Sequence, residues 1–464
     1  MSLSKDLGRL SFLLSALIFL LAVEVDVFGI AQDFEYDYDG VIADDYSDWN
    51  RTIRDLITLL PGYNCTGDPT WPYGVEQIFP CQILPPSESP PNSVHMLRPA
   101  DINVIGAIGD SLTAANGGGA CSLPQLLFQY RGKSFSHGGD ESYETVPTLA
   151  NILRKYNPNL KGYGVGTGTW STDNAGMNVA VPGSVAYEIQ EQAERLVQKM
   201  KDDASIDYEK DWKLVTIFIG GNDLCEVCKD KTLYSPGAYV NNVQRAIQVL
   251  HNKMPRTFVN VIGILDLRQI NEFRGFVCKA SHIGFCPCVA AVRDDELEKE
   301  WTPTLLQYQS QLEALVTSGT FDDKEDFTVV YQPFLHESKI PMIGGAGDLS
   351  YMAPDCFHFS AKGHAETGKS LWNNMVQPVG SKATAWVLDG PFTCPTKESP
   401  FLYTNVNSRK GASSTKRPVT EKKGGAVTAD TADDGPGGDA SVFSPAHQLA
   451  LLVIGAFVSM FNLC

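Results

Sequence analysis

Five residues that lie far apart in this 464-residue sequence have the chemistry of an acyl-transfer site. A serine hydroxyl attacks an ester only when a base removes its proton, and the resulting oxyanion needs hydrogen-bond donors already in place. Ser111 offers the hydroxyl, His358 the base, and Asp355 a carboxylate that orients the imidazole. We assign the oxyanion donors to the backbone N–H groups of Ser111 and Gly183 and the side-chain amide of Asn222. This set predicts a serine hydrolase that works through an acyl-enzyme.

Each of these elements alone has a plainer explanation. Ser111 lies in a Gly-Asp-Ser turn of common composition, and Gly183 suits an ordinary turn. An Asp-x-x-His pair such as Asp355 and His358 is more often a contact at the start of a helix. The catalytic interpretation is favoured because all the elements occur in one order, each directly after a predicted strand or before a predicted helix.

Apolar runs that predict buried strands alternate with helical patterns over most of the chain. The predicted strands are Val104–Ile108, Met177–Val181, Leu214–Gly220, Phe258–Leu267 and Phe327–Tyr331. The predicted helices are Tyr187–Met200, Val240–Met254, Leu297–Val316 and one that contains Leu371 and Trp372. Unbroken apolar strands that alternate with helices form parallel sheets covered on both faces. We therefore predict an α/β fold, a three-layer α/β/α sandwich with a mostly parallel five-stranded sheet. Active sites of such sheets gather at the carboxyl ends of the strands, where the five residues are expected.

Four blocks of this sequence resemble, in order, the blocks of the GDSL or SGNH hydrolases. They are G-D-S-L at 109–112, Gly183, G-G-N-D at 220–223 and D-C-F-H at 355–358. Over roughly residues 93–380 the chain looks most like the membrane-associated phospholipase B group of that family. The resemblance implies a flavodoxin-like fold, the catalytic roles assigned above, and removal of fatty acyl chains from phospholipids and lysophospholipids without a metal or other cofactor. Mammalian members of the group carry several tandem repeats, whereas one set of blocks is found here, so substrate preference stays open.

Composition and the remaining motifs argue against several other functions. The formal net charge of −17 argues against a nucleic-acid partner, which needs a clustered cationic surface. An α/β-hydrolase elbow requires Gly-x-Ser-x-Gly, but Thr113 occupies the last glycine position. His364 is predicted to be a surface or helix-capping residue rather than a metal ligand. Two alternatives stay open: an SGNH esterase acting on acylated carbohydrate or small esters, and a catalytically inactive cell-surface binding protein.

The amino-terminal part of the sequence predicts export. Residues 1–31 have a basic start, an apolar core and small residues near the end, as a signal peptide does. Residues 32–95 read as an acidic leader and Pro-rich linker, and the hydrolase domain is predicted at 96–395. Asn50 and Asn64 begin glycosylation sequons.

The sequence has eleven cysteines, which we interpret as those of an exported protein. Cys464 lies in a tail predicted to be removed, which leaves an even number and a working count of five disulfides of open pairing. The pairs Cys225-x-x-Cys228 and Cys286-x-Cys288 can be drawn as a zinc site, but disulfides are expected in an oxidising compartment.

The carboxyl-terminal part of the sequence predicts a lipid anchor. Residues 396–440 read as a disordered stalk, and 441–464 as a hydrophobic GPI-type signal with its processing site within 437–441. A short transmembrane tail is the alternative. The expected location is the outer face of the plasma membrane, beside phospholipid substrate, with the oligomeric state left open.

Overall fold

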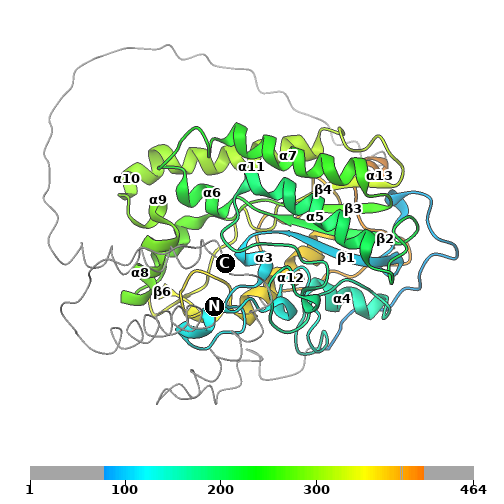
Figure 1. Cartoon of the computed structure of the whole chain (residues 1–464), viewed down its shortest axis with the longest axis horizontal. Helices are drawn as coiled ribbons and strands as arrows, with labels where there is room; N and C mark the ends of the chain where they lie inside the picture. The colour runs from blue at the N-terminus through cyan, green and yellow to red at the C-terminus, as the bar shows by residue number, and fades with distance from the viewer. Residues whose placement is uncertain (1–77, 387, 389, 412–464) are drawn as a thin grey trace, which may run out of the picture. The chain divides into compact units, whose positions relative to one another are not determined.

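A parallel sheet lies at the centre of the part of the chain that the computed structural model describes, residues 78–411 without 387 and 389 (Figure 1). Its strands follow the order β1 (Ile102–Gly109), β2 (Trp212–Phe218), β3 (Thr257–Ile262) and β4 (Phe327–Gln332). All three pairings are parallel. Every residue of β2, β3 and β4 is buried, as expected of strands covered on both faces. The α/β class predicted from the sequence is confirmed.

The predicted fifth strand, Met177–Val181, is not a strand, so the sheet has four strands rather than five. The segment still runs parallel to β1 on its free edge: the Ala107 N–H donates to the Met177 carbonyl over 3.1 Å, and the Val179 N–H donates to the Ala107 carbonyl over 3.0 Å. A regular ladder would next need the N–H of Gly109, but that group donates to the Gln192 side chain. Diversion of this one donor interrupts the ladder. The segment and the four strands together keep a flavodoxin-like order.

Helices cover the sheet on both faces (Figure 1). One face carries α5 (Ile189–Asp202), α7 (Pro236–Lys253) and α11 (Thr302–Thr317); the other carries α4 (Leu149–Tyr156) and α12 (Ala361–Met375). The shorter elements are α3 (Ser111–Ala114), α6 (Gly221–Glu226), α8 (Phe276–Phe285), α9 (Pro287–Ala290), α10 (Asp294–Glu296), α13 (Asn405–Gly411), β5 (Met342–Ile343) and β6 (Ala346–Gly347). The single-turn helices are η2 (Val94–Met96), η3 (Pro99–Asp101), η4 (Leu123–Leu127), η5 (Arg131–Lys133), η6 (Asp173–Ala175), η7 (Ala186–Glu188), η8 (Leu267–Glu272), η9 (Leu297–Trp301) and η10 (Leu349–Tyr351).

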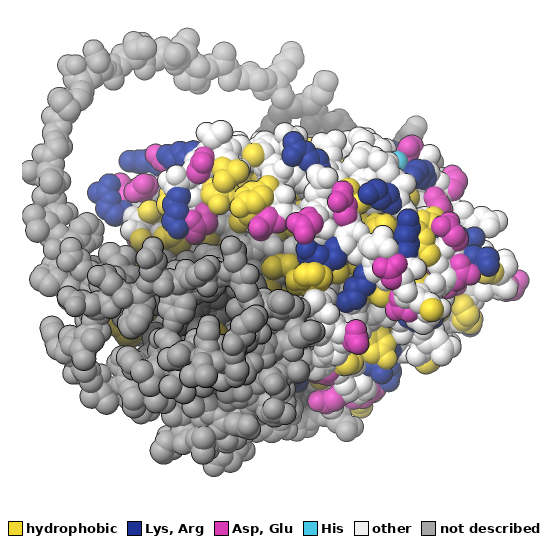
Figure 2. Space-filling model, in the orientation of Figure 1, with side chains coloured by type: hydrophobic (Ala, Val, Ile, Leu, Met, Phe, Trp, Pro, Cys, Tyr) yellow, Lys and Arg dark blue, Asp and Glu magenta, His cyan; other side chains and the backbone are white. Residues whose placement is uncertain are grey.

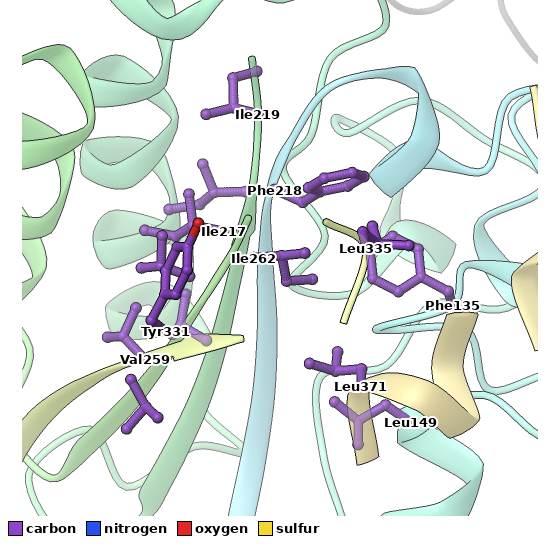
Figure 3. Packing of buried hydrophobic residues seen from close by; sticks show 14 of the residues in the cluster. Phe135, Leu149, Ile217, Phe218, Ile219, Val259, Ile262, Tyr331, Leu335 and Leu371 are labelled. Carbon is purple, nitrogen blue, oxygen red and sulfur yellow. The ribbon is translucent and has the colours of Figure 1, made fainter. Parts of the chain in front are cut away.

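Side chains that alternate along the strands fill the two layers of the core. Figure 3 shows Ile217 and Phe218 on opposite sides of the sheet, with Ile217 on the side of Val259. The ring of Phe218 meets that of Phe135 edge to face, with centroids 5.9 Å apart. Leu371 of α12 lies on that same side. Successive strand residues point to opposite faces, so one apolar strand supplies both cores.

Three further predicted elements differ most from the structure. The predicted helix Val240–Met254 begins earlier, at Pro236 in α7. The predicted strand Phe258–Leu267 ends at Ile262, after which the chain leaves the sheet. The predicted helix Leu297–Val316 is divided into the π-helical turn η9 and the helix α11. Pro303, at the start of α11, has no N–H to donate to the preceding turn, which explains why a regular helix begins only there.

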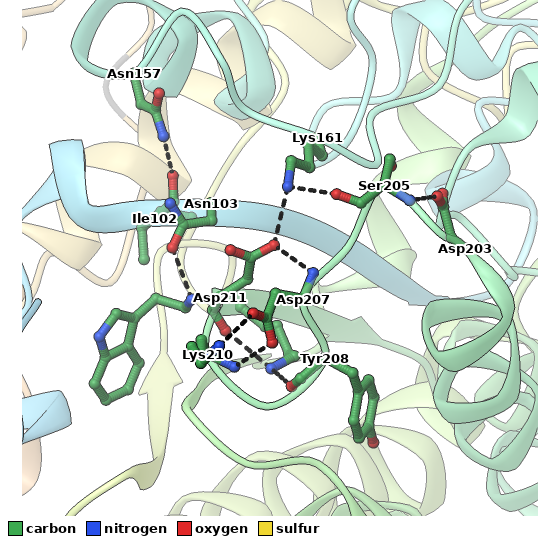
Figure 4. A network of polar contacts seen from close by, with 12 residues as sticks. Ile102, Asn103, Asn157, Lys161, Asp203, Ser205, Asp207, Tyr208, Lys210 and Asp211 are labelled. Carbon is green, nitrogen blue, oxygen red and sulfur yellow. Dashed lines mark hydrogen bonds and ion pairs between the residues drawn. The ribbon is translucent and has the colours of Figure 1, made fainter.

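A network of polar side chains holds the amino ends of β1 and β2 (Figure 4). The Lys161 ammonium donates to Asp211 over 3.0 Å and to the Ser205 carbonyl over 2.6 Å. Asn103 in β1 accepts the backbone N–H of Trp212 in β2 over 2.8 Å, which aligns the two strands. This end of the sheet is therefore fixed by contacts that lie away from the carboxyl ends.

Residues beyond both predicted limits of the hydrolase domain, 96 and 395, contact it in the structure. Cys81 is bridged to Cys394, so part of the predicted linker is tied to the domain. Leu402 is buried in what was predicted as stalk, and its N–H donates to the Leu97 carbonyl over 2.8 Å. The predicted signal peptide, both glycosylation sequons, the rest of the stalk and the GPI-type signal lie outside the described residues.

The surface of the described part mixes both signs of charge. On the face shown in Figure 2, acidic and basic side chains are interspersed. Within residues 78–411, no helix has the length and apolar character needed to cross a membrane.

Candidate active site

Ser111 lies at the carboxyl end of β1, in the turn that leads into α3. Gly109 ends the strand, and a Cβ there would lie 2.4 Å from the Phe218 carbonyl oxygen and 2.4 Å from Thr113 Oγ1, so no larger residue fits. The Asp110 carboxylate accepts the Leu112 N–H over 2.9 Å and caps the turn. Only 7% of Ser111 is exposed. The turn thus places the serine at the carboxyl edge of the sheet, where parallel α/β folds have their active sites.

His358 and Asp355 come to Ser111 from the other end of the domain. His358 Nε2 lies 2.9 Å from Ser111 Oγ, and His358 Nδ1 lies 2.6 Å from Asp355 Oδ2. The second carboxylate oxygen of Asp355 accepts the backbone N–H groups of Phe357 and His358, each over 3.0 Å. The structure therefore brings the three residues that the sequence predicted as a triad into one hydrogen-bonded series.

The carboxylate of Asp355 is held in its ionised form. Burial raises the pKa of Asp355, but the charge and hydrogen bond of His358, together with the two backbone N–H groups, lower it by more. The net pKa lies below the usual value, so Asp355 carries a negative charge at neutral pH. An ionised carboxylate accepts the Nδ1 proton of His358, which leaves Nε2 free to accept the proton of Ser111.

Helix α8 fixes the loop between Asp355 and His358. Cys278 in α8 is bridged to Cys356 in that loop, and Cys356 has a left-handed backbone with φ of +58°. His282, one turn further along α8, donates from Nε2 to the Cys356 carbonyl over 2.8 Å. Two independent contacts to one residue thus limit the movement of the acid–base pair.

The predicted oxyanion donors lie on two adjoining segments. Asn222 is in α6, lines the same cavity as Ser111, and donates through Nδ2 to the Ser184 carbonyl over 2.8 Å. Gly183 is exposed, has a φ of +80°, and precedes Ser184 directly, although it does not line that cavity. In the part of the chain that the structure describes, the backbone N–H groups of Ser111 and Gly183 have no protein acceptor. These groups are therefore available to a ligand.

Gln192, which the sequence analysis missed, joins the serine turn to the segment that carries Gly183. Its Oε1 accepts the Gly109 N–H over 2.9 Å, and its Nε2 donates to the Gly109 carbonyl and to Ser184 Oγ, each over 3.0 Å. The side chain is buried in α5. A signal was present: Gln192 is the polar member of the apolar stripe formed by Ile189, Ala193 and Leu196.

Two further buried carboxylates lie behind the site. Burial raises the pKa of Asp110 to about 6, against the opposing effects of the Leu112 N–H and the charge of His358. Burial raises the pKa of Asp223 to about 7, and the nearby charge of Asp110 adds to that rise. Asp223 accepts the Ala186 N–H at 3.0 and 3.1 Å from its two oxygens. It therefore holds the segment 183–186 at Ala186, whereas Gln192 holds it at Ser184.

A largely apolar cavity opens beside Ser111. Polar side chains in its lining include those of Asn222, Asp266, Gln269 and Ser338. Its apolar lining consists of Leu112, Phe218, Ile264, Leu265, Leu267, Ile270, Phe273, Leu335, Ile340, Met352, Phe357, Phe359 and Trp386. Such a lining suits a hydrocarbon chain placed next to the serine.

The cysteines and His364 were also assigned from the sequence. Cys225 is bridged to Cys286 and Cys228 to Cys288, which confirms the disulfide interpretation over the zinc one. The prediction that His364 is a surface or capping residue is wrong. Its ring is buried in α12, stacked on Phe135 at 6.2 Å, and burial lowers its pKa to about 3. Among the described residues, no group of three His, Cys, Asp or Glu side chains is placed to hold a metal ion.

Comparison with known proteins adds to this geometry. The family model of GDSL-like lipase/acylhydrolases matches residues 105–371. The membrane-associated phospholipase B1 of Homo sapiens is 46% identical over 344 residues, which cover 71% of this chain and 23% of the human protein. The Rattus norvegicus protein of the same name is 44% identical over 343 residues, 72% of this chain and 24% of the rat protein. The chain thus spans about a quarter of the length of these relatives.

A solved structure also matches at low similarity. It is a GDSL-like lipase from Parabacteroides merdae, with 16% identity and a TM-score of 0.32 over 60% of this chain and 95% of that one. A score that low supports no conclusion about this chain.

Proposed function

The chain belongs to the GDSL-like lipase/acylhydrolase family, and from that premise we propose that it is a serine hydrolase of phospholipase B type. It removes fatty acyl chains from phospholipids and lysophospholipids through Ser111, His358 and Asp355, without a metal. The observation that carries the proposal is the hydrogen-bonded series of these three residues in the wall of an apolar cavity.

The reaction proceeds through two half-reactions. His358 Nε2 takes the proton from Ser111 Oγ as the oxygen attacks the ester carbonyl carbon. The backbone N–H groups of Ser111 and Gly183 and the Asn222 amide stabilise the oxyanion. His358 then returns the proton to the leaving alcohol oxygen, and the fatty acyl chain stays on Ser111. In the second half, His358 takes a proton from water, the hydroxide attacks the acyl carbon, and the fatty acid leaves as Ser111 regains its proton.

The cavity lining supports one of the substrate classes left open by the sequence. Aromatic and aliphatic side chains such as Phe218, Ile270 and Phe357 surround the space beside Ser111. Asn222, Asp266, Gln269 and Ser338 also line this space, but most of the lining residues are apolar, which suits a fatty acyl chain better than an acylated carbohydrate. This observation favours long-chain acyl esters over the alternative of acylated carbohydrate or small esters.

The test of the proposal is covalent labelling combined with turnover. A fluorophosphonate probe and phosphatidylcholine are given to the wild type, to Ser111→Ala and to Ser171→Ala, a matched change at an exposed serine. Ser111→Ala is expected to lose labelling and at least about a thousandfold in fatty-acid release, with unaltered thermal unfolding. Ser171→Ala and chelator-treated wild type should retain both. Undiminished release by Ser111→Ala, or a calcium requirement, would refute this mechanism.

The proposed location is the outer face of the plasma membrane, held by a GPI anchor. It is supported by the predicted signal peptide at 1–31, the apolar tail at 441–464, and the membrane-associated names of the relatives. A phosphatidylinositol-cleaving phospholipase should release the protein from intact cells into the medium. Retention on cells after that treatment would favour the transmembrane tail instead.

A further inference from the structure

Three short segments that adjoin cavity-lining residues expose large apolar side chains. They are the start of α8, the hairpin of β5 and β6, and the turn η10. The exposed side chains and their exposed fractions are Phe276 with 82%, Val277 with 37%, Met342 with 50%, Ile343 with 65% and Leu349 with 50%. Each segment adjoins a cavity-lining residue, namely Phe273, Ile340 and Met352 in the same order. The exposed apolar surface is therefore continuous in the chain with the wall of the cavity.

The hairpin is unusual for a segment that faces water. Residues 340–347 read I-P-M-I-G-G-A-G and contain no charged or hydrogen-bonding side chain. Gly344 and Gly345, with φ of +60° and +76°, form the two-residue turn that β-hairpins favour. The Asp348 N–H donates to the Pro341 carbonyl over 2.7 Å and closes the base. An exposed apolar tip on a hairpin is unfavourable in water, so the tip indicates an apolar partner.

The hairpin is held against the chain that leads into α8. A Cβ on Gly347 would lie 2.6 Å from the Phe273 ring, so the two segments touch closely. The Gln269 side chain accepts the Ile340 N–H over 2.7 Å and donates to the Ser338 carbonyl over 2.6 Å. Figure 1 accordingly shows β6 beside α8. We call the exposed apolar side chains on these elements the rim: Phe276, Val277, Met342, Ile343 and Leu349.

We propose that the rim inserts into the acyl layer of a phospholipid surface, so that the cavity beside Ser111 opens directly onto the lipid. This inference rests on the proposed function: because the cavity is proposed to bind a fatty acyl chain, the surface that the rim contacts is proposed to be phospholipid. An acyl chain that enters from the lipid surface then passes from the rim to cavity-lining side chains such as Phe273 and Ile340 without crossing water. This continuity favours a lipid surface over a second copy of the chain or another protein.

Apolar insertion rather than charge attraction provides the binding. The charged residues nearest in sequence balance one another: Glu272, Glu337 and the half-buried Asp348 against Arg274, Lys279 and Lys339. The rim is therefore expected to bind zwitterionic phosphatidylcholine and to be insensitive to salt, whereas binding by charge would need anionic lipid and would weaken with salt.

The test uses the full chain with Ser111→Ala, so that binding is measured without turnover. Flotation with phosphatidylcholine vesicles is compared for this protein, for the same protein with Met342→Ser and Ile343→Ser, and for a matched control with Leu233→Ser and Leu306→Ser. The control side chains have similar exposed fractions, 42% and 56%, and lie outside the rim. Any lipid anchor is common to all three. The rim change is expected to weaken partitioning at least about tenfold, and the control less than about twofold.

A kinetic ratio gives a second measurement in proteins that keep Ser111. Phosphatidylcholine in vesicles and a water-soluble short-chain ester are hydrolysed by the wild type, the rim variant and the control. The ratio of vesicle to soluble turnover should fall about tenfold in the rim variant alone, and Phe276→Ser should lower it in the same direction. An unchanged ratio with unchanged flotation overturns the inference, as does a change of oligomeric state in the rim variant. Failure of the proposed function is distinct, because the wild type would then bind vesicles without releasing fatty acid.

Discussion

The two ends of the parallel strands carry aspartates in opposite electrostatic surroundings. At the amino end of β2, Asp211 pairs with Lys161 at 3.0 Å, and a hydrogen bond from a neighbouring lysine lowers the pKa of Asp207. At the carboxyl ends, Asp110 and Asp223 are buried, and burial raises their pKa values to about 6 and about 7. Among the described ion pairs, neither has a Lys or Arg partner. At the amino end, the carboxylates are charged and pair with lysines near solvent. At the carboxyl end, burial makes the carboxylates of Asp110 and Asp223 costly to ionise.

The groups that donate hydrogen bonds to each carboxylate explain why the pKa of Asp355 differs from those of Asp110 and Asp223. Asp355 is as deeply buried as Asp110, but its pKa is lowered because His358 and two backbone N–H groups all favour the charged form. The backbone N–H groups of Ala186 and of Asp223 itself lower the pKa of Asp223, but they do not outweigh its burial. Asp110 and Asp223 also have two backbone N–H groups each, so the direct hydrogen bond from His358, which only Asp355 of these three accepts, accounts for the difference. Perturbed carboxylates of this kind gather at functional sites.

The largest expected effect comes from removing the fixed charge. In Asp355→Asn the amide cannot stabilise a protonated His358, so the rate constant kcat for ester hydrolysis should fall about a thousandfold to ten-thousandfold. Asp211→Asn, the same change at the amino end, should leave kcat within about twofold. Steady-state turnover of a soluble ester measures both variants. Equal rates in the two would remove the distinction between the ends of the sheet.

The next prediction tests Gln192, which joins the serine turn to the segment that carries Gly183. Gln192→Leu leaves the Gly109 N–H without its acceptor and frees Ser184, whereas the Gly109 carbonyl keeps the Val181 N–H. The rate constant kcat should therefore fall about tenfold to a hundredfold, with a smaller change in KM. Gln192→Glu keeps the acceptor for the Gly109 N–H and should lose less. Gln198→Leu, at an exposed site on the same helix, is the matched control. If all three variants kept the wild-type kcat, Gln192 would be a packing residue.

The residues of the sheet were predictable because their patterns are local. Apolar runs gave β1, β2 and β4 within two residues at each end, and the blocks around Ser111 and His358 indicated which side chains meet. The interrupted fifth strand was not predictable, because it depends on Gln192 taking the N–H of Gly109 from 83 residues away. The role of Gln192 was hidden for the same reason. Periodicity places it on a buried face but does not say what it meets there.

The pH dependence of stability distinguishes a carboxylate whose ionisation is suppressed by burial from one whose charge is stabilised. Because the folded-state pKa of Asp223, about 7, lies above its ordinary value of 3.8, the folded protein holds this proton more tightly than the unfolded chain. The resulting loss of stability is absent below pH 4 and grows as the pH rises toward 7. Asp223→Asn removes it, so the unfolding temperature of the variant relative to wild type should rise by a few degrees from pH 5 to pH 8. A difference that falls with pH would contradict the burial argument.

The smallest effect is expected at the amino end, where the carboxylates have solvent and lysines. The side chains of Lys161 and Asp211 are 35% and 16% exposed, so water already screens much of their attraction. Lys161→Met, Asp211→Asn and the double variant should therefore give a coupling free energy of at most about 1 kcal/mol in urea unfolding, weakening with salt. A coupling several times larger, or a loss of ester turnover, would mean that the amino-end network reaches the site through β1. Contacts at both ends of the sheet would then contribute to the position of the serine turn, and the two ends would differ only in the size of that contribution.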